Sequence, residues 1–461
     1  MVIDELLKHL TKKPTHDSFL KARVSIIDWI GYSIAGTKTK QAKPFLNIQK
    51  ILPKGSSLNL FSKNKLNFFD STFINAAVGN ILELDDVHRT SIIHPGDTVI
   101  PAAIAAASYK KVSPYKFLQA IVSGYEASIR MGICLGKEHY KYFYSSATCG
   151  VYGATTAASM ILNHDTSESN INKKLNTSIQ LSTMTSSGVW QCREGLGEAK
   201  QYALANAARS GITAAFLAQN GAKAPDNMIE GQMGFLKAYT NQIDYQNLIK
   251  NNKTYYINEV SNKPWPACRH SHPVIGTSLE LVKYMKENNQ IIDNVSSIEI
   301  QTYKVAIDFC DKINPTNRTE GKFSLQHCCA ISLMFNEIKE DYFNQEFINN
   351  PNVQIIRNKV KVKENFKMSS SFPNEYSVSI KLNFTNGFHF EITNKHAKGD
   401  PENSMSENEI CEKTFALLEN ASVNMNGAKI LIDKILKTDI SQDDYKSDIC
   451  WFNDLQNIIP N

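Results

Sequence analysis

The chain has 461 residues, a length that favours two domains over one. Hydrophobic residues make up 42% and charged residues 21%, the balance of an ordinary globular protein and not of a disordered one. The net charge of +5 comes without a basic run, so nucleic-acid binding has no support, whereas a local cationic pocket for an acidic substrate is compatible with it.

The N-terminal segment and the cysteine usage both favour the cytoplasm. The N-terminus lacks the architecture of a signal peptide, and the most apolar segments (99–108 and 150–162) are too short and too rich in small residues to cross a bilayer. Nine cysteines, an odd number without C-x-x-C spacing, favour reduced thiols over disulfides or a zinc site. We therefore expect a cytoplasmic protein that does not insert into membranes.

The first half of the chain predicts one helix after another, because apolar residues recur at helical spacing. Alanine and glycine stripes in several of these helices allow close helix–helix approach, so 1–256 is predicted to form the first part of a tightly packed helical domain. The small residues of 150–162 also suggest a flat surface for a second copy of the chain. The predicted helices cover 19–35, 71–84, 101–110, 114–135, 150–162, 170–181 and 200–219.

From about Ile257 the pattern changes to the alternation of strands, interleaved with helices at 273–286 and 324–336. An Asn-Gly pair at 386–387 predicts a hairpin between two of the strands. We predict an α+β domain over 257–397 and a helical tail over 398–461 that packs back on the helical domain, with Ser406 as its N-cap. The predicted strands cover 297–303, 359–363, 376–384 and 388–393.

The densest group of titratable residues lies between two apolar helical segments, in the loop from residue 83 to residue 94. Such density at a helix exit suits proton transfer or anion handling, although a solvated helix end gives the same pattern. The group could also hold a divalent metal, but no further ligand of matching type completes such a site, so no metal is expected. Its members are Glu83, Asp85, Asp86, His88 and His94.

Two further loops carry candidate proton-transfer groups. The aromatic, hydroxyl-rich loop 141–150 contains Tyr144, and the glycine-containing loop 193–200 delivers Lys200 onto the first turn of a helix. A cation at this end opposes the helix dipole, which eases deprotonation of the lysine. A packed surface loop and a solvated lysine are the alternatives.

Cationic groups gather further along the chain. The proline-rich segment 263–273 carries Lys263, Arg269 and His272, which suits either carboxylate binding or a rigid domain junction. His327 stands at the start of an apolar helix, where a histidine is also often a hydrogen-bonded core residue.

Taken together and in this order, the motifs resemble the MmgE/PrpD family over nearly the whole length. The resemblance implies a mainly α fold, with a large all-helical domain and a smaller α+β lid domain, a homodimer, and no metal or organic cofactor. The family includes 2-methylcitrate dehydratases, cis-aconitate decarboxylases and iminodisuccinate epimerases. The matching motifs are 76–88, His94-Pro-Gly96, 123–126, 150–154, Lys200 with its helix, 230–235, 263–272 and 322–324.

This chain departs from the dehydratases and decarboxylases of the family at several positions. They typically carry histidine where Tyr144 stands and often tyrosine where His327 stands, and Glu83 replaces the usual aspartate. The pair of Tyr144 and Lys200 instead resembles the epimerase branch. The sequence therefore favours an epimerase over a dehydratase or decarboxylase.

The resemblance implies proton abstraction next to a carboxylate of a small di- or tricarboxylic acid. Lys200 and Tyr144 are the expected two bases of an epimerase, whereas a lyase would use Lys200 as base and His94 or His327 as acid. A catalytically silent ligand-binding or scaffold protein is the remaining alternative. Lys263, Arg269 and His272 are expected to bind carboxylates, and His88 and His94 to polarise the reacting one, with Glu83 or Asp86 fixing their tautomers.

Overall fold

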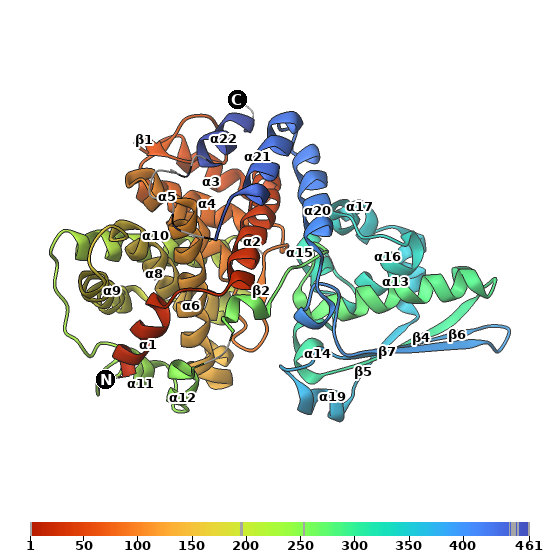
Figure 1. Cartoon of the computed structure of the whole chain (residues 1–461). Helices are drawn as coiled ribbons and strands as arrows, with labels where there is room; N and C mark the ends of the chain where they lie inside the picture. Colours follow the sequence, from red (N-terminus) through yellow and green to blue (C-terminus); the bar gives the residue numbers. More distant parts are fainter. Residues whose placement is uncertain are drawn as a thin grey trace. The chain divides into compact units, whose positions relative to one another are not determined.

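The computed structural model describes residues 2–193, 197–251, 254–441, 443, 449 and 451–459 (Figure 1). The chain is mainly α-helical and divides into two compact units. The larger, the helical unit, comprises Met1–Ile81, Asp85–Ser261 and Ser406–Asn461. The smaller, the α+β unit, comprises Leu82–Leu84 and Asn262–Met405. The predicted combination of a large helical part and a smaller α+β part is confirmed.

The helical unit is built around α8 (Gly150–Leu162), whose thirteen residues are all buried. Four helices pack against it: α5 (Gly96–Tyr109), α6 (Pro114–Tyr142), α9 (Glu168–Ser182) and α10 (Ala199–Gln219). Since α8 lies inside the unit, it offers no surface to a second copy of the chain, and the suggestion drawn from its small residues is wrong on this point.

Glycines set the spacing of the central helices. A Cβ on Gly124 of α6 would lie 2.8 Å from the carbonyl O of Gly153 of α8, and one on Gly211 of α10 would lie 2.7 Å from the carbonyl O of Val151. Contacts this short exclude a side chain, so the three helices approach through their backbones. The predicted close packing of small residues is confirmed here.

The remaining helices and short strands surround this centre. They differ from the prediction mainly at helix ends: α4 stops five residues before 84, and α6 continues beyond 135 across a break at Gly136, where φ is 66°. The further elements of this unit are α1 (Val2–Thr11), α2 (His16–Gly36), η1 (Lys40–Ala42), α3 (Lys43–Gln49), β1 (Lys54–Ser57), α4 (Phe68–Gly79), β2 (Val87–His88), α7 (Ser145–Thr148), η2 (Thr183–Thr185), η3 (Trp190–Arg193), α11 (Phe235–Tyr239), α12 (Tyr245–Ile249), η4 (Tyr256–Glu259), β3 (Val260–Ser261), α20 (Glu407–Asn420), α21 (Met425–Lys437) and α22 (Trp451–Ile458).

The C-terminal helices return to the helical unit. The side chain of Ser406 accepts from the backbone of Glu409, whose carboxylate accepts from the Ser406 N–H, so the predicted N-cap is confirmed as a full capping box. α20 packs along α2 (Figure 1), where Lys413 Nζ lies 2.7 Å from Asp28 Oδ1. A buried ion pair thus joins two helices that are far apart in sequence.

The α+β unit contains a four-stranded sheet in the order β5-β4-β6-β7. Strands β4 (Val295–Thr302) and β5 (Val360–Glu364) are parallel, and β6 (Val378–Phe384) pairs antiparallel with β4 and with β7 (His389–Asn394). The turn between β6 and β7 contains Gly387 at a φ of 86°, as the Asn-Gly pair predicts. The hairpin prediction is confirmed.

Helices pack against this sheet and close its core. α13 (His272–Glu287) contacts β6 and β7, and α16 (Leu325–Phe335) contacts β5 and α13. The core includes Cys328 and Cys329, which are fully buried among apolar side chains. The other elements of the unit are η5 (Arg269–Ser271), η6 (Ile292–Asn294), α14 (Lys304–Cys310), α15 (Arg318–Lys322), η7 (Glu340–Phe343), α17 (Gln345–Ile348), α18 (Pro351–Asn358), α19 (Phe366–Ser371) and η8 (Pro401–Asn403).

The borders of the units differ from 257 and 397 by a few residues, for local reasons. Residues up to Ser261 belong to the helical unit because β3 pairs with β2. Residues 398–405 belong to the α+β unit because the Asn262 N–H donates to the carbonyl O of Gly399 (3.0 Å) and Asp400 pairs with Arg269.

Candidate active site

The site is built on the segment that joins α4 to α5. Its short strand β2 pairs with β3, and the His88 N–H donates to the carbonyl O of Ile93 (2.8 Å). The turn between these two residues contains Ile92 at a φ of 52°, a conformation that β-branched residues rarely adopt. The turn places His94 two residues before Gly96, where α5 begins.

The imidazole of His94 is held through one ring nitrogen. Its Nδ1 lies 2.6 Å from Asp85 Oδ2 and 2.8 Å from the backbone carbonyl O of Asp86. Because a carboxylate and a carbonyl can only accept, Nδ1 carries the hydrogen, and Nε2 is the nitrogen that can exchange protons. The carboxylate beside His94 is therefore that of Asp85, whereas the sequence suggested Glu83 or Asp86.

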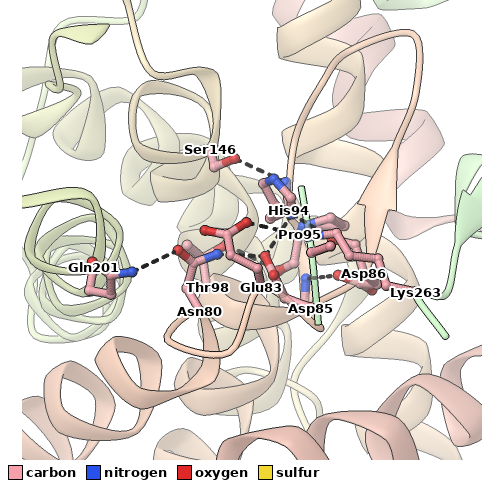
Figure 2. A network of polar contacts seen from close by, with 12 residues as sticks. Asn80, Glu83, Asp85, Asp86, His94, Pro95, Thr98, Ser146, Gln201 and Lys263 are labelled. Atoms are coloured by element: carbon pink, nitrogen blue, oxygen red, sulfur yellow. Dashed lines mark hydrogen bonds and ion pairs between the residues drawn. The ribbon is translucent and has the colours of Figure 1, made fainter. Parts of the chain in front are cut away.

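A chain of hydrogen bonds extends from this pair (Figure 2). Asn80 Nδ2 donates to Asp85 Oδ2 (2.6 Å), and Gln201 Nε2 lies 3.5 Å from Asn80 Oδ1. On the other side, the His94 N–H donates to Ser146 Oγ (3.0 Å). Five side chains from α7, α10 and the segment between α4 and α5 thus form one connected network in the helical unit.

Lys200 and Tyr144, the two predicted bases, lie near each other in the same unit. Lys200 stands in the first turn of α10, and its Nζ is over the ring of Tyr144, 6.0 Å from the ring centroid. Tyr144 is buried and stacks on Trp190, with ring centroids 4.8 Å apart and planes at 20°. Residues 194–196 of the predicted lysine-bearing loop lie outside the described residues.

Asp86 and His88 have their side chains satisfied inside the helical unit. Asp86 Oδ2 accepts from the Tyr125 hydroxyl (2.6 Å) and its Oδ1 from the Gly96 N–H (3.0 Å), and burial raises its pKa to about 7. His88 Nδ1 lies 2.8 Å from Ser91 Oγ, and burial lowers the pKa of His88. These partners hold the loop in place.

The predicted carboxylate-binding cations lie in the α+β unit. Lys263 Nζ is 3.6 Å from Glu83 Oε2, and both side chains are almost fully buried. His272, at the start of α13, has its Nε2 3.2 Å from the carbonyl O of Ala267. Glu83 has a positive φ of 57°, so this pairing occurs in an unusual backbone conformation.

Arg269 combines a structural partner with unused donors. Its Nη2 pairs with Asp400 Oδ1, and its guanidinium lies over the ring of Tyr376, 5.1 Å from the centroid. Its Nε and Nη1 are buried and have no hydrogen-bond partner among the described residues. Because unsatisfied buried donors are costly, this edge of the guanidinium is suited to an anion such as a carboxylate.

His327 lies in the core of the α+β unit. Its ring is fully buried, its Nε2 is 2.9 Å from the carbonyl O of Tyr342, and burial lowers its pKa to about 4. The ring is therefore neutral near pH 7, with Nε2 donating to the carbonyl. The contact of Nε2 is typical of a packed core histidine, one of the two alternatives that the sequence left open, whereas the buried Nδ1 has no hydrogen-bond partner among the described residues.

Four residues of the network were missed by sequence reasoning as site residues. Asp85 was noted only as a member of the titratable group and as a potential metal ligand, and none of Asn80, Ser146 and Gln201 was proposed for any role. The usable signal was the position of Ser146 in the same loop as Tyr144. Asp85 and Asp86 are adjacent, and the contact of His94 with Asp85 depends on the turn between residues 88 and 93. The spacing of apolar residues does not predict this turn.

Among the described residues, one group of three side chains has metal-ligand atoms within 4.8 Å of one another: His396, Asp400 and Glu402, in the α+β unit. Asp400 already pairs with Arg269 and accepts from the Ala397 N–H (3.0 Å). The group is thus explained by its contacts within the chain.

Known proteins resemble this chain over most of its length. Residues 6–247 match the MmgE/PrpD N-terminal domain, and residues 265–436 match the MmgE/PrpD C-terminal domain, which continues through α20 into α21. A cis-aconitate decarboxylase from Mus musculus is 22% identical over 390 residues, covering 78% of this chain and 75% of the relative. One from Homo sapiens is 23% identical over 381 residues, covering 78% and 76%.

The described helices include none that is long and apolar enough to cross a membrane. The two matched domains cover most of the chain: the first lies in the helical unit, and the second covers the α+β unit from residue 265 and continues into the C-terminal helices of the helical unit. This chain belongs to the MmgE/PrpD family.

Proposed function

We propose that this chain is a cofactor-independent epimerase that inverts a carbon next to a carboxylate of a small di- or tricarboxylic acid. The observation that carries the proposal is the placement of Lys200 Nζ over the Tyr144 ring, 6.0 Å from its centroid. Proton transfer needs each base within about 3 Å of the reacting atom. The contact brings the two candidate proton-transfer groups into the same part of the helical unit.

The reaction would proceed in two proton transfers. The neutral amine of Lys200 takes the proton from one face of the carbon, and the electron pair moves into the carboxylate to give an enediolate. The hydroxyl of Tyr144 then gives its proton to the opposite face as the enediolate collapses. After product release, Lys200 loses its extra proton to solvent and Tyr144 regains one from solvent, which restores the starting state. His94 would donate a hydrogen bond to the carboxylate oxygen on which charge develops, an interaction that strengthens in the transition state.

The substrate class follows from the α+β unit. The free edge of Arg269, with buried donors on Nε and Nη1, suits a carboxylate that does not react. Lys263 and His272 are the further candidates, together with Glu83, Asp86 and His88 from the first loop. Several cationic side chains in this segment fit a substrate with two or three carboxylates.

A lyase is the second candidate, and the relatives favour it, because both are named cis-aconitate decarboxylases. In a lyase of the dehydratase type, Lys200 removes the proton and a β hydroxyl leaves as water with a proton from His94. In a decarboxylase, the carbon–carbon bond to a carboxylate breaks, carbon dioxide leaves, and the carbanion takes a proton. Tyr144 favours the epimerase instead, because the dehydratases and decarboxylases of the family typically carry histidine at this position.

Deuterium exchange separates these reactions. The protein is incubated in deuterated water with a panel of chiral di- and tricarboxylic acids and followed by proton NMR and polarimetry. Loss of the α-proton signal together with loss of optical rotation supports the epimerase. New alkene protons or released carbon dioxide support the lyase instead. Binding measured by thermal shift without exchange or turnover of any acid would leave only the ligand-binding or scaffold alternative.

The assembly is part of the same proposal. The family resemblance supports a homodimer, and the cysteine usage supports a location in the cytoplasm. For a dimer of 51.7 kDa chains, light scattering would give twice the mass of one chain. A mass that stays at the value of one chain across micromolar concentrations would argue against the dimer.

A further inference from the structure

Two acceptors share the Nδ1 hydrogen of His94, and they contribute differently. The backbone carbonyl O of Asp86 (2.8 Å) is a neutral acceptor, and it can fix the tautomer without help. The carboxylate of Asp85 (2.6 Å) adds a full negative charge beside the ring. A negative charge favours the imidazolium over the neutral imidazole, so the distinct contribution of Asp85 is to the protonated form.

The carboxylate of Asp85 is held in this position by the fold. It is completely buried, an environment in which a charge persists only with close partners. Asn80 Nδ2 donates to the same Oδ2 atom that meets His94 (2.6 Å), and Gln201 lies next to the carbonyl end of Asn80. Since Gln201 directly follows Lys200, the chain of contacts links the segments that carry two proton-transfer groups.

We propose that Asp85 is a positioning residue that keeps His94 protonated, which makes His94 the acid toward an oxygen of the substrate and leaves Lys200 as the base toward its carbon. The inference rests on the proposed function, and it holds for the epimerase and for the lyase. In the epimerase, Nε2–H gives its proton to the carboxylate oxygen as the enediolate forms and takes it back as the enediolate collapses. Nδ1 keeps its hydrogen and Asp85 stays ionised throughout, so no proton is gained or lost over the cycle.

The test is the pH dependence of activity in Asp85→Asn, measured with an acid that the wild-type enzyme turns over. Asparagine preserves the shape of the side chain and removes the charge. We expect the alkaline limb of the kcat profile, on which His94 loses its proton, to move to lower pH by at least about one unit. Activity above that limb then falls at least about tenfold and recovers on acidification, which loss of folding alone would not produce.

Asp86→Asn is the matched control, because it is the same change at the neighbouring residue. The Asp86 carboxylate contacts Tyr125 and Gly96, and only its backbone contacts His94. We expect its alkaline limb to move much less. If the two variants move the limb equally, or if Asp85→Asn leaves it in place, Asp85 has no special relation to His94 and the inference is wrong.

A measurement without substrate separates this inference from the proposed function. Nitrogen NMR of ¹⁵N-histidine-labelled wild-type protein, with His94 assigned by its loss in His94→Gln, should show hydrogen on Nδ1 in the neutral ring. The same signal should lose its second proton at lower pH in Asp85→Asn. If both hold and no acid is turned over, the pairing stands and the proposed function fails. If neutral His94 carries its hydrogen on Nε2, the inference fails whatever the activity, even where Asp85→Asn does not fold.

Discussion

The candidate site residues of the two units are held in different ways. In the helical unit, Asp85, His94 and Asn80 form a continuous network, in which Asn80 holds the Asp85 carboxylate and His94 can transfer a proton. In the α+β unit, the cations are paired one by one, Lys263 with Glu83 and Arg269 with Asp400, in a buried environment. The network suits proton transfer. The ion pairs neutralise cations that would be unfavourable in a buried position without a partner.

This difference has a physical reason. A buried cation without a partner is strongly unfavourable, so a unit that is to receive an anion must neutralise its cations until the anion arrives. Arg269 keeps one partner in Asp400 and leaves Nε and Nη1 unsatisfied, which lets it accept a second anion without giving up the first. We therefore expect the contribution of Arg269 to be mixed, partly to folding and partly to binding.

The largest expected effect tests this mixed role. Arg269→Ala leaves the buried Asp400 carboxylate without its guanidinium, which should lower the free energy of unfolding by about 3–5 kcal/mol. Denaturant unfolding monitored by circular dichroism measures the loss. Arg318→Ala is the control, because Arg318 pairs with Glu340 at a partly exposed position and should cost at most about 1 kcal/mol.

A second variant separates folding from binding at the same residue. Arg269→Lys keeps the charge near Asp400 but loses the fork that binds a carboxylate through two donors. If Arg269 binds substrate, this variant stays folded and its KM rises more than its kcat falls. An unchanged KM in a folded variant would assign Arg269 to the structure of the α+β unit alone.

The next effect concerns the helical unit. Lys200→Ala should lower kcat by at least about a hundredfold, the low end for loss of a general base. Lys200→Arg should restore little, because a guanidinium does not give up its proton near neutral pH. Steady-state kinetics with the acid found in the exchange experiment measures both, and near-normal turnover in either folded variant would remove Lys200 from the mechanism.

Tyr144→Phe distinguishes the two candidate reactions at the same site. In the epimerase it should abolish inversion and still permit deuterium exchange from the face that Lys200 serves. In a lyase with Lys200 as the sole base it should only slow elimination modestly. Inversion at the normal rate in the phenylalanine variant would show that the second proton comes from another group.

A smaller effect is the pH dependence of stability caused by Asp86, whose pKa burial raises from 3.8 to about 7. Between about pH 4 and pH 7 the folded chain keeps this proton and the unfolded chain has lost it. Asp86 therefore lowers stability as pH rises through this window. Asp86→Asn should remove the effect, so that the variant gains roughly 1–2 kcal/mol relative to wild type between about pH 5 and about pH 8.

Asp165→Asn is the control with the opposite pH dependence of the free energy of unfolding. Its hydrogen bond and ion pair with Lys110 lower the pKa of Asp165, so its contribution is present above the ordinary pKa of an aspartate and lost on acidification. Buried histidines titrate in wild type and variants alike and cancel in the comparison. The outcome that would contradict the Asp86 prediction is a difference in free energy of unfolding between Asp86→Asn and wild type that is the same at about pH 5 and about pH 8. Asp86 would then be ionised in the folded chain over this whole range.

The sequence could predict what local pattern determines. Helical spacing, the Asn-Gly turn and the Ser406 cap each involve residues within a few positions of one another, and the structure has all of them. The end of α4 was overestimated because Ile81, Leu82 and Leu84 continue the helical pattern, although the chain leaves the helix after Gly79. Hydrophobic spacing does not indicate where a helix ends when the residues that follow it continue the same spacing.

The site was harder to predict, because its contacts are not local in pattern. Asp85 and Asp86 are adjacent and chemically identical, yet one carboxylate meets His94 and the other meets Tyr125. The turn at Ile92, with its positive φ, decides between them, and nothing in that residue type predicts such a conformation. His327 shows the same limit, since an apolar helix start fits a buried histidine and a binding residue equally.

The smallest effect sharpens the assignment of the C-terminal tail to the helical unit. Ser406→Ala removes a capping box at the point where the chain returns from the α+β unit, and should cost about 1 kcal/mol. Ser167→Ala, at the start of α9, removes a single cap bond, to the Asn170 N–H, and should cost no more than Ser406→Ala. Because α20 packs on α2 through the buried pair of Lys413 and Asp28, loosening its first turn should increase hydrogen exchange in α2 as well as in α20. Exchange that rises only in the α+β unit would place the helix with that unit instead.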